Sequence, residues 1–399
     1  MGVLSAVLRR SRTGTTVAAL TVGALVLSGC AGSSLDQSGG EQADGPVKIG
    51  LLVPLSGVYA PLGEDMRNGF QLYLDQHGGK LGGRTVELVS ADEGESPQTG
   101  VPAAQKLVTQ DQVTAVVGVV NSATALGLRD FFHESKKPLL IANAGADDIT
   151  GARKSEYVWR TSFSNGEVAA ALGAAVAEEA GGPVYLIAAD YAAGKEMIAG
   201  FRKTFEAAGG KVAGEEYTPF GTTQDFQPFL SAIRGTDAKA VYSFYAGAEA
   251  VSFVKQYKQF GLAGDLPLYG TGFLTEGGVL DAQGEAASGV KTSLHYSTEL
   301  DTPRNKEYVD AYRKAYDEAP TVYTVQAYDA AAVLDKALAS APGGGGEELV
   351  KALGAVGQVD SPRGPWSFDA DHNAEQKYYL REVRSGGGGM VNAVVSELS

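Results

Sequence analysis

The chain is poor in the residues that build metal sites and disulfides. It holds one cysteine and four histidines among 399 residues. One cysteine cannot form a disulfide framework or a cysteine-based zinc cluster. The histidines lie too far apart in the sequence for two of them to bind one metal ion from a single helix: His77, His133, His295 and His372. We therefore expect no metal site and no cofactor.

Basic residues are also scarce. Lys and Arg number 33 against 47 Asp and Glu, so the formal net charge is −14. A strongly acidic surface repels the phosphate backbone of nucleic acids, which excludes nucleic acid as a partner. The hydrophobic fraction of 44% and the charged fraction of 20% are those of a soluble globular protein that is large enough for more than one core.

Long hydrophobic runs are missing, and the nearest approach to one lies at the N-terminus. Residues 1–29 carry three arginines and no acid, with a short apolar run over 17–27. A basic start, a short apolar run and small residues before Cys30 are typical of a secretory signal peptide, and the apolar run is too short to span a bilayer. Its removal leaves 30 basic and 47 acidic residues, a net charge of −17. The sequence therefore predicts an exported protein.

The lone cysteine follows Leu-Ser-Gly, an arrangement that resembles the lipobox of bacterial lipoproteins. The resemblance implies that Cys30 is lipidated and becomes the first mature residue. The alternative is a signal peptide that is cut elsewhere and leaves Cys30 as a free thiol. Residues 31–45 are rich in Gly, Ser and polar residues, so we expect 30–45 to form a flexible tether between the membrane and the fold.

From residue 47 onward, short apolar runs alternate with helical patterns. The expected strands lie at 47–54, 85–90, 114–120 and 138–142 in a first half, and at 184–189, 212–217, 240–244 and 266–270 in a second half. Strands that alternate with helices form parallel sheets covered on both faces. We therefore predict an α/β fold with two lobes. Residues 364–368, 376–384 and 390–396 are expected to be short antiparallel strands, and a strand at 290–295 could join either lobe.

Motifs of enzyme active sites are missing: the sequence has no GxSxG, GxxxxGK[ST] or HExxH, and no GxGxxG after a strand. We therefore do not expect an enzyme. In open α/β sheets, ligands bind beyond the carboxyl ends of the strands. Four loops follow strands in this way: 54–59, with Ser56 and Tyr59; 121–124, which is Asn121, Ser122, Ala123 and Thr124; 143–146; and 190–194, with Tyr191. The loop 121–124 is either a simple helix cap or an anion-binding helix start.

Acidic and aromatic residues also gather near strand ends. Acidic clusters at 92–95 and 147–148 suggest paired carboxylates or a calcium site, but solvated loops explain them as well, and we favour that interpretation. His295 either contacts a ligand or is a surface histidine. The aromatic side chains either pack in the core or line an apolar ligand cavity: Tyr59, Tyr191, Phe244, Tyr245, Phe273 and Tyr296.

The order of these segments resembles that of the type I extracytoplasmic substrate-binding proteins of ABC importers, the family of the leucine-, isoleucine- and valine-binding proteins. The segments that carry the resemblance are 47–50 (VKIG), 54–57 (PLSG) with Gly63, 68–69 (NG), 78–79 (GG), 81–84 (LGGR), 116–118 (VVG) with Ser122, 160–161 (RT), 190–195 (DYAAGK), 225–226 (DF) and 327–330 (AYDA). The resemblance covers the chain from residue 46 to its end. No single motif is diagnostic, but their order and spacing are.

The resemblance implies the type I periplasmic binding protein fold, with two doubly wound Rossmann-like lobes joined by a three-strand hinge. It places lobe 1 at 46–164 and 290–366, and lobe 2 at 165–289 and 367–399. It also implies a monomer that closes about its hinge on a small-molecule ligand. An ABC permease and ATPase complex would then recognise the closed form.

The resemblance also implies which residues contact the ligand. The loop that holds the ligand carboxylate in the family corresponds to 121–124, together with Ala144, Gly145 and Ala146. Ala193 and Ala246 stand where relatives often have an aromatic side chain. The neighbouring Phe244 and Tyr245 would take over that contact.

Two positions of the family pattern have lost a carboxylate in this chain. Asn165 and Gly272 stand where amino-acid binders have the acids that hold the ligand ammonium. An ammonium without a partner in a closed cleft is costly, which argues against an α-amino acid unless Glu249 or Glu276 approaches the site. A carboxylate-bearing aromatic molecule fits better than leucine.

We therefore expect an extracytoplasmic solute-binding lipoprotein, held at the membrane through Cys30, that captures a small carboxylate and delivers it to an ABC importer. A binder of branched-chain or other amino acids, or a ligand sensor for a signalling partner, would share this fold and site. A secreted enzyme of similar build would need a nucleophile–base pair or a metal cluster, and the sequence shows neither.

Overall fold

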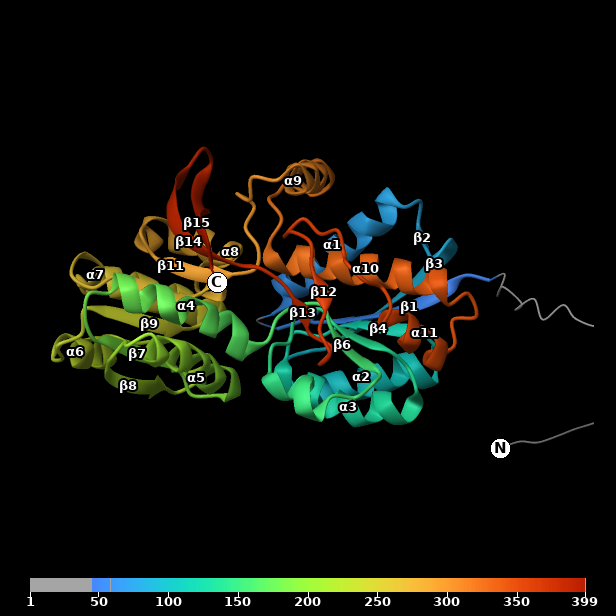
Figure 1. The fold of residues 1–399 in the computed structure, drawn as a ribbon, viewed down its shortest axis with the longest axis horizontal. Helices are drawn as coiled ribbons and strands as arrows, with labels where there is room; N and C mark the ends of the chain where they lie inside the picture. Colours follow the sequence, from blue (N-terminus) through green and yellow to red (C-terminus); the bar gives the residue numbers. More distant parts are fainter. Residues whose placement is uncertain (1–44, 58, 399) are drawn as a thin grey trace, which may run out of the picture. The chain divides into compact units, whose positions relative to one another are not determined.

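The computed structural model describes residues 45–57 and 59–398. The expected signal peptide, the lipidation of Cys30 and nearly all of the expected tether lie outside the described residues. Within these ranges, no helix combines the length and the apolarity that crossing a membrane requires. The described chain folds around two large sheets (Figure 1).

The first sheet has the strand order β2-β3-β1-β4-β5-β6, and its neighbours pair in parallel except β2 with β3. Its strands are β1 (Val47–Val53), β2 (Lys80–Leu81), β3 (Arg84–Asp92), β4 (Ala115–Gly118), β5 (Leu139–Ile141) and β6 (Val158–Arg160). Successive residues of β1 face opposite sides, as a strand requires. Leu51 packs with helices α1 (Ala60–Gln76) and α10 (Val322–Ser340), and Leu52 packs with α2 (Pro97–Thr109) and α3 (Ser122–Ser135).

The second sheet has the order β15-β14-β11-β10-β9-β7-β8. It is parallel from β8 to β11 and antiparallel at β14 and β15. Its strands are β7 (Val184–Ala189), β8 (Val212–Thr218), β9 (Ala240–Phe244), β10 (Leu268–Thr271), β11 (Lys291–Leu294), β14 (Tyr378–Gly386) and β15 (Gly389–Leu398). Leu186 packs with α4 (Asn165–Glu179) and α5 (Ala192–Ala207), whereas Ile187 packs with α6 (Gln227–Arg234) and α7 (Gly247–Gln259).

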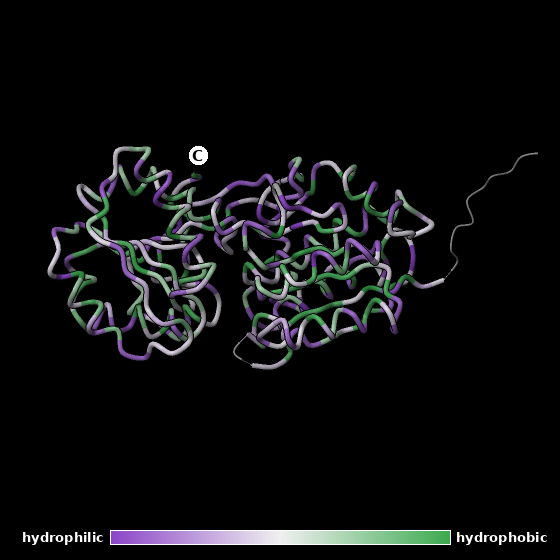
Figure 2. Tube along the Cα trace, turned by 90° about the horizontal axis from the view of Figure 1, so that it is seen from below, coloured by the Kyte–Doolittle hydropathy of each residue, from purple (hydrophilic) through white to green (hydrophobic). Residues whose placement is uncertain are grey.

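Both sheets are thus buried on two faces, which explains the near-continuous apolar strands of the sequence. In Figure 2, long hydrophobic segments run through the interior of the fold, and many hydrophilic segments lie at its periphery. The remaining elements are α8 (Gly278–Gln283), α9 (Pro303–Tyr316), α11 (Gly346–Leu353), β12 (Ser367–Phe368), β13 (Ala374–Glu375) and the 3₁₀ helices η1 (Asp147–Ile149), η2 (Gly151–Arg153), η3 (Leu262–Gly264), η4 (Gly272–Thr275) and η5 (Gly284–Ala287). The predicted α/β class with two parallel, doubly covered sheets is confirmed.

One strand contradicts our domain boundary at residue 290. The resemblance assigned 290–366 to lobe 1, but β11 pairs with β10 and β14 in the second sheet. From the sequence alone, the strand at 290–295 could have joined either lobe, because a short apolar run does not indicate the strand with which it pairs. We propose that lobe 2 extends to the end of β11; the rest of the division stays a prediction. The strand expected at 364–368 forms only β12, which pairs with β13 outside both large sheets.

Candidate functional site

A cavity of about 300 Å³ opens where loops leave the carboxyl ends of strands in both sheets. This is the position at which open α/β sheets bind ligands. Ten residues that we selected from the sequence line it: Tyr59, Asn121, Ser122, Ala123, Gly145, Asn165, Tyr191, Ala193, Phe244 and Phe273. Its volume is that of a site for a small molecule.

The start of helix α3 forms one wall of the cavity. Asn121 is the N-cap residue, and its side-chain Oδ1 accepts the backbone N–H of Thr124 at 3.0 Å. The loop 121–124 therefore caps a helix, which is compatible with both a simple cap and an anion-binding helix start. The next two residues, Ser122 and Ala123, line the cavity, and their N–H groups belong to the first turn of the helix. Such N–H groups have no partner within their helix and favour an anion.

Three further helices begin at the same cavity. Tyr191, Ala192 and Ala193 form the start of α5, Ala246 is the N-cap residue of α7, and Asn165 is the first residue of α4. The sequence had placed 192–194 in a loop, but they form the first turn of α5. Each helix N-terminus carries a partial positive charge, so the starts of α3, α4, α5 and α7 together favour a negatively charged ligand.

Aromatic rings form the other walls. Tyr191 stacks on Phe220 with ring centroids 4.2 Å apart, and lies 6.1 Å from the ring of Phe244. Phe163 and Phe273 form a second pair at 4.7 Å. Two such groups of rings offer flat apolar surfaces on which an aromatic ligand can pack.

Among the described residues, the cavity lining contains no Asp, Glu, Lys, Arg or His. A carboxylate lies just behind it at Glu196, whose Oε2 accepts the side-chain N–H of Asn165 at 2.7 Å. Burial raises the pKa of Glu196 above its ordinary value, and the Asn165 hydrogen bond opposes that shift. A ligand anion would therefore be held by helix starts and neutral donors rather than by a cation.

A buried carboxylate supports the start of α3 from below. Glu93 has no exposed surface, and its two oxygens accept the backbone N–H groups of Val120 and Asn121, each at 2.7 Å. Burial raises the pKa of Glu93 to about 8, although these two hydrogen bonds act in the opposite direction. Nearby, Asp92 accepts the N–H groups of Leu55 and Gly94. The acidic cluster at 92–95 thus braces loops, and no described group of three or more His, Cys, Asp or Glu side chains is arranged for a metal ion.

Four of the selected residues lie near the cavity but do not line it. Ser56 donates its hydroxyl to Asp92 at 2.7 Å, and Thr124 is buried behind the α3 cap. Ala144 and Ala146 pack in the core beneath the loop, where the Ala146 N–H donates to the Ser122 hydroxyl at 3.1 Å. In the loop 144–146, only the middle residue, Gly145, reaches the cavity.

Two selected aromatics are core residues. Phe244 ends β9 and lines the cavity, whereas the next residue, Tyr245, faces the opposite side because consecutive residues of a strand alternate. Tyr245 packs on Phe253 with ring centroids 4.6 Å apart and shares a hydrogen bond with Thr218 at 3.2 Å. Tyr296 is likewise fully buried away from the cavity. The expectation that these two side chains line the cavity is wrong.

His295 and Gly272 are also placed elsewhere. His295 is fully buried rather than exposed, and it lies within hydrogen-bonding distance of Gln326 at 3.1 Å. Gly272 is packed so tightly that an added Cβ would lie 2.4 Å from a guanidinium nitrogen of Arg381. An acid at position 272 would therefore need the neighbouring Arg381 and Leu294 to move. Neither His295 nor Gly272 lines the ligand cavity.

The sequence analysis missed nine residues that line the cavity: Leu62, Val120, Asn143, Phe163, Ala192, Met197, Phe220, Ala246 and Tyr323. Asn143 and Ala192 lay inside loops that we had singled out, and Ala246 had been noted where relatives carry an aromatic. Phe220 follows strand β8, so its position after a strand end could have identified it from the sequence. Tyr323 comes from α10, far along the chain, and no local pattern connects it to this site.

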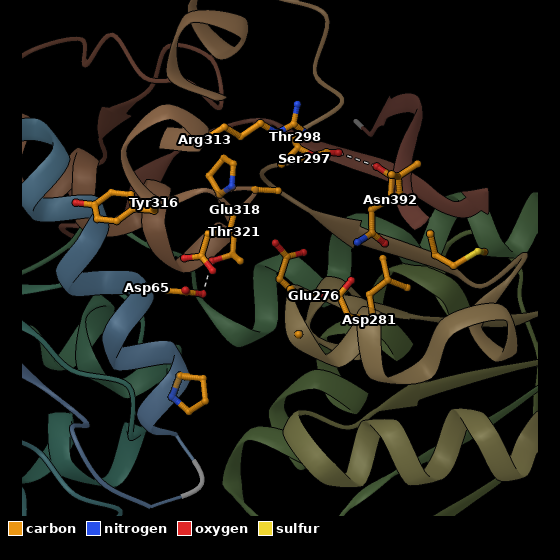
Figure 3. Close-up of a pocket in the computed structure, with 18 of the residues that line it drawn as sticks. Asp65, Glu276, Asp281, Ser297, Thr298, Arg313, Tyr316, Glu318, Thr321 and Asn392 are labelled. Carbon is orange, nitrogen blue, oxygen red and sulfur yellow. Dashed lines mark hydrogen bonds between the residues drawn. The ribbon is translucent and has the colours of Figure 1, made fainter. Parts of the chain in front are cut away.

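A second, larger cavity of about 610 Å³ lies at residues of α1, α9 and β15 and the loop before α10 (Figure 3). Its lining includes six acids and two arginines: Glu64, Asp65, Glu276, Asp281, Glu299, Glu318, Arg313 and Arg381. Burial raises the pKa of Asp65 to about 7, and neighbouring acids add to this shift, while the Thr321 hydroxyl bonds the carboxylate at 2.7 Å and opposes it. None of the residues selected as ligand contacts lines this cavity.

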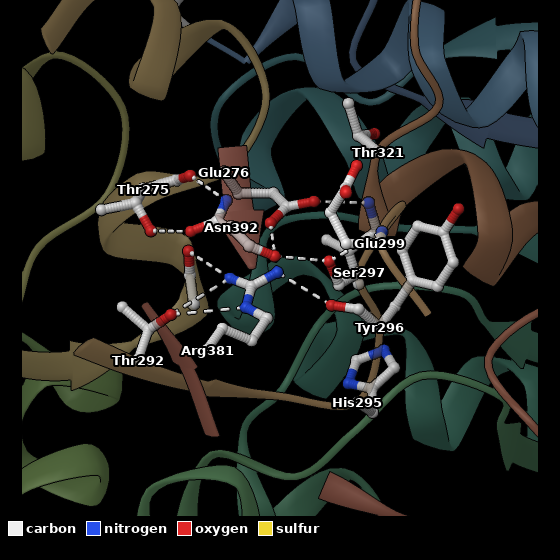
Figure 4. A network of polar contacts seen from close by, with 12 residues as sticks. Thr275, Glu276, Thr292, His295, Tyr296, Ser297, Glu299, Thr321, Arg381 and Asn392 are labelled. Atoms are coloured by element: carbon white, nitrogen blue, oxygen red, sulfur yellow. Dashed lines mark hydrogen bonds and ion pairs between the residues drawn. The ribbon is translucent and has the colours of Figure 1, made fainter. Parts of the chain in front are cut away.

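The second cavity is polar because a network of hydrogen bonds lies beside it and connects segments that are distant in sequence (Figure 4). Arg381 donates to Glu276 at 2.9 Å and to the carbonyl of Tyr296 at 2.8 Å. The other oxygen of Glu276 accepts the N–H of Val322, the first residue of α10, at 2.8 Å. Both carboxylate oxygens of Glu276 therefore have partners in this network. Glu249 accepts the N–H of Gly221 at 2.8 Å. Neither acid lines the ligand cavity.

Comparison with known proteins agrees with this geometry. A family model described as periplasmic binding protein matches residues 46–388. The solute-binding protein of an ABC transporter from R. palustris, solved in complex with benzoate, is 38% identical with a TM-score of 0.81, covering 89% of this chain and 98% of that one. A second R. palustris protein, solved with 4-hydroxybenzoate, is 30% identical with a TM-score of 0.82, covering 89% and 97%. A Leu/Ile/Val-binding protein homolog from Brucella melitensis is 32% identical over 345 residues, covering 84% of this chain and 87% of the relative.

Proposed function

We propose a ligand from one premise: this chain belongs to the periplasmic binding protein family, the solute-binding proteins of ABC transporters. Its ligand, we propose, is a small aromatic carboxylate of the size and chemistry of benzoate or a hydroxybenzoate. The carboxylate would lie at the start of α3, beside Asn121, Ser122 and Ala123. The ring would pack between the aromatic walls that include Tyr191 and Phe273.

One observation carries this proposal: the described cavity lining combines several helix starts with aromatic walls and has no charged side chain. An anion needs donors, and the first-turn N–H groups of α3 and α5 supply them without a counter-charge. An α-amino acid also brings an ammonium group. That group would be buried here without a carboxylate in contact, at a cost on the order of several kcal/mol.

The ligands of two relatives support the proposal. The R. palustris proteins described above were solved with benzoate and with 4-hydroxybenzoate. Other relatives are named as Leu/Ile/Val-binding proteins, so family membership alone does not select the ligand. The loss of the expected carboxylate at Asn165, which lines the cavity, favours the aromatic acid.

The biological role follows from the family. We propose that the protein is exported, held at the membrane through lipidated Cys30, and acts as a monomer. Ligand that contacts loops of both sheets would favour a closed form, which an ABC permease would recognise. We propose no enzymatic activity, because the described cavity lining has no nucleophile paired with a base.

A thermal-shift series with matched ligands tests this function. Benzoate, benzamide and leucine differ in charge and in ring, and only benzoate combines an aromatic ring with an anion without an ammonium. We expect benzoate to stabilise the protein, by about 2.7 kcal/mol at one hundred times its Kd, and the other two to do little. Stabilisation by leucine together with indifference to benzoate and to hydroxybenzoates would refute the proposal.

A further inference from the structure

Three polar side chains connect the ligand cavity to the protein interior. Asn143 lines the cavity, and its Nδ2 donates to Oε1 of Gln326 at 2.9 Å. Gln326 lies in α10 with no exposed surface, and its Nε2 is 3.1 Å from Nε2 of His295. His295 directly follows β11 and is also fully buried. The three residues form a relay from the ligand cavity to a histidine.

The imidazole at the end of this relay is neutral. Burial lowers the pKa of His295 well below its ordinary value, and the positive charges of Arg363 and Arg381 lower it further. A neutral imidazole carries its proton on one nitrogen and a lone pair on the other. Nδ1 of His295 has no hydrogen-bond partner in the described chain, so Gln326 is the group that distinguishes the two tautomers.

As assigned in the structure, Asn143 donates to Gln326, and Gln326 donates to Nε2 of His295. Turning both side-chain amides by about 180° exchanges their N and O atoms, so the relay can run in two directions without any other movement. In one, Nε2 of His295 accepts from Gln326, Gln326 accepts from Asn143, and Asn143 turns its carbonyl oxygen to the cavity. In the other, Nε2–H of His295 donates to Gln326, Gln326 donates to Asn143, and Asn143 turns its NH₂ group to the cavity. The tautomer of His295 thereby decides whether the cavity is offered an acceptor or a donor.

We propose that Asn143 determines specificity by offering its NH₂ group to the ligand carboxylate, with His295 held in the Nε2–H tautomer. This inference rests on the proposed function, because an ammonium, which can only donate, would select the opposite direction. Asn143 lines the same cavity as the start of α3, where the proposed carboxylate binds, and its loop contacts that start through the Ala146 N–H, which donates to the Ser122 hydroxyl. The Nε2–H tautomer also leaves Nδ1 as an unpaired acceptor, and folded proteins tolerate that better than an unpaired buried N–H.

Nitrogen-15 NMR of the imidazoles tests the proposal in the benzoate complex. We expect the proton of His295 on Nε2. His77 and His372 are internal references for the opposite tautomer, because Nδ1 of each lies within 3.0 Å of a backbone carbonyl oxygen, to which only an N–H can donate. A complex in which His295 carries its proton on Nδ1 overturns the proposal.

A second arm needs no ligand. In Asn143→Asp, at a pH where the carboxyl ¹³C shift shows the introduced side chain to be ionised, the new carboxylate can only accept from Gln326. Gln326 must then accept from His295, so we expect the Nε2–H tautomer in the free variant. A folded variant in which His295 carries its proton on Nδ1 contradicts the relay, whether or not benzoate binds to the wild type.

Affinity separates this proposal from the proposed function. Asn143→Leu removes the donor at similar volume, and we expect about a tenfold loss of benzoate affinity, the usual size for a hydrogen bond to a charged group. Full benzoate affinity in this variant would contradict the role of Asn143 while leaving the proposed function intact. Failure of the wild type to bind any aromatic acid would contradict the proposed function, and the Asn143→Asp arm would still decide the relay.

Discussion

The carboxylate of Glu93 accepts the backbone N–H of Asn121 at 2.7 Å, directly before the helix start that lines the ligand cavity. The same carboxylate accepts the N–H of Val120. Glu93 therefore fixes the loop that presents Ser122 and Ala123 to a ligand. It is also an ionisable group, without exposed surface, close to the proposed position of an anion.

The ionisation of Glu93 predicts how ligand affinity depends on pH. Burial raises its pKa to about 8, so the side chain is largely neutral below that pH and negative above it. A negative charge under a bound carboxylate is repulsive, so we expect benzoate affinity to fall as the pH rises through about 8. Calorimetric titrations across this range measure the effect. Glu93→Gln, which cannot ionise, is the control and should show a flatter profile; equal profiles would contradict the prediction.

Phe244 and Tyr245 form a matched pair, because they are consecutive residues whose side chains lie on opposite faces at the end of β9. Phe244→Ala removes a ring from the cavity wall, and we expect benzoate affinity to fall about 10-fold to 100-fold. Tyr245→Phe removes only the hydroxyl that meets Thr218, so affinity should stay unchanged while the free energy of unfolding falls by about 1 kcal/mol. Titration and denaturant unfolding of both variants check this. A larger loss of affinity in the Tyr245 variant would reverse the assignment of the two rings.

A carboxylate introduced at position 165 tests the need for an uncharged cavity. Asn165→Asp is nearly isosteric, but it places a negative charge in the cavity lining. The new charge would lie next to Glu196, which accepts a hydrogen bond from Asn165 in the wild type. Like charges repel, so we expect at least about a tenfold loss of benzoate affinity at neutral pH. Asn165→Ala controls for loss of the amide and should lose less. Equal losses in the two variants would show that charge is not what matters there.

Asp65 predicts a pH-dependent stability that is independent of the ligand. Its pKa is about 7 in the fold, mainly through burial, against an ordinary value of 3.8. The folded protein therefore holds this proton more tightly than the unfolded chain, and Asp65 makes stability fall as the pH rises from about 4 to 7. Relative to wild type, Asp65→Asn should gain about 2–4 kcal/mol between pH 4 and 8, measured by urea unfolding. A constant difference across that range would contradict the raised pKa.

Much of the fold and part of the site were accessible from the sequence. Apolar strands that alternate with helices predict two parallel sheets, and the rule that ligands bind at carboxyl ends of strands directs attention to the loops around Tyr59, Asn121 and Tyr191. The residues that line the cavity from these loops follow from that rule. The missing acid at Asn165 was also visible, because it departs from the pattern of amino-acid binders.

The rest depends on three-dimensional packing. Consecutive residues at the end of a strand face opposite sides of the sheet, and the sequence does not say whether Phe244 or Tyr245 faces the ligand. Tyr323 reaches the cavity from α10, which the order of the chain does not connect to the loops. β11 pairs in the second sheet, which the sequence could not show because the partner of a strand is decided by tertiary structure. His295 was expected at the surface or on the ligand, and it is instead buried two side chains away from the cavity.

The central claim is that the cavity selects an anion with an aromatic ring over a zwitterionic amino acid. Isothermal titration of the purified mature protein with benzoate and with leucine, in one buffer at neutral pH, tests it most directly. The account predicts saturable one-to-one binding of benzoate and no measurable heat of binding for leucine. Tight binding of leucine, with benzoate and its hydroxylated forms inert, would contradict it.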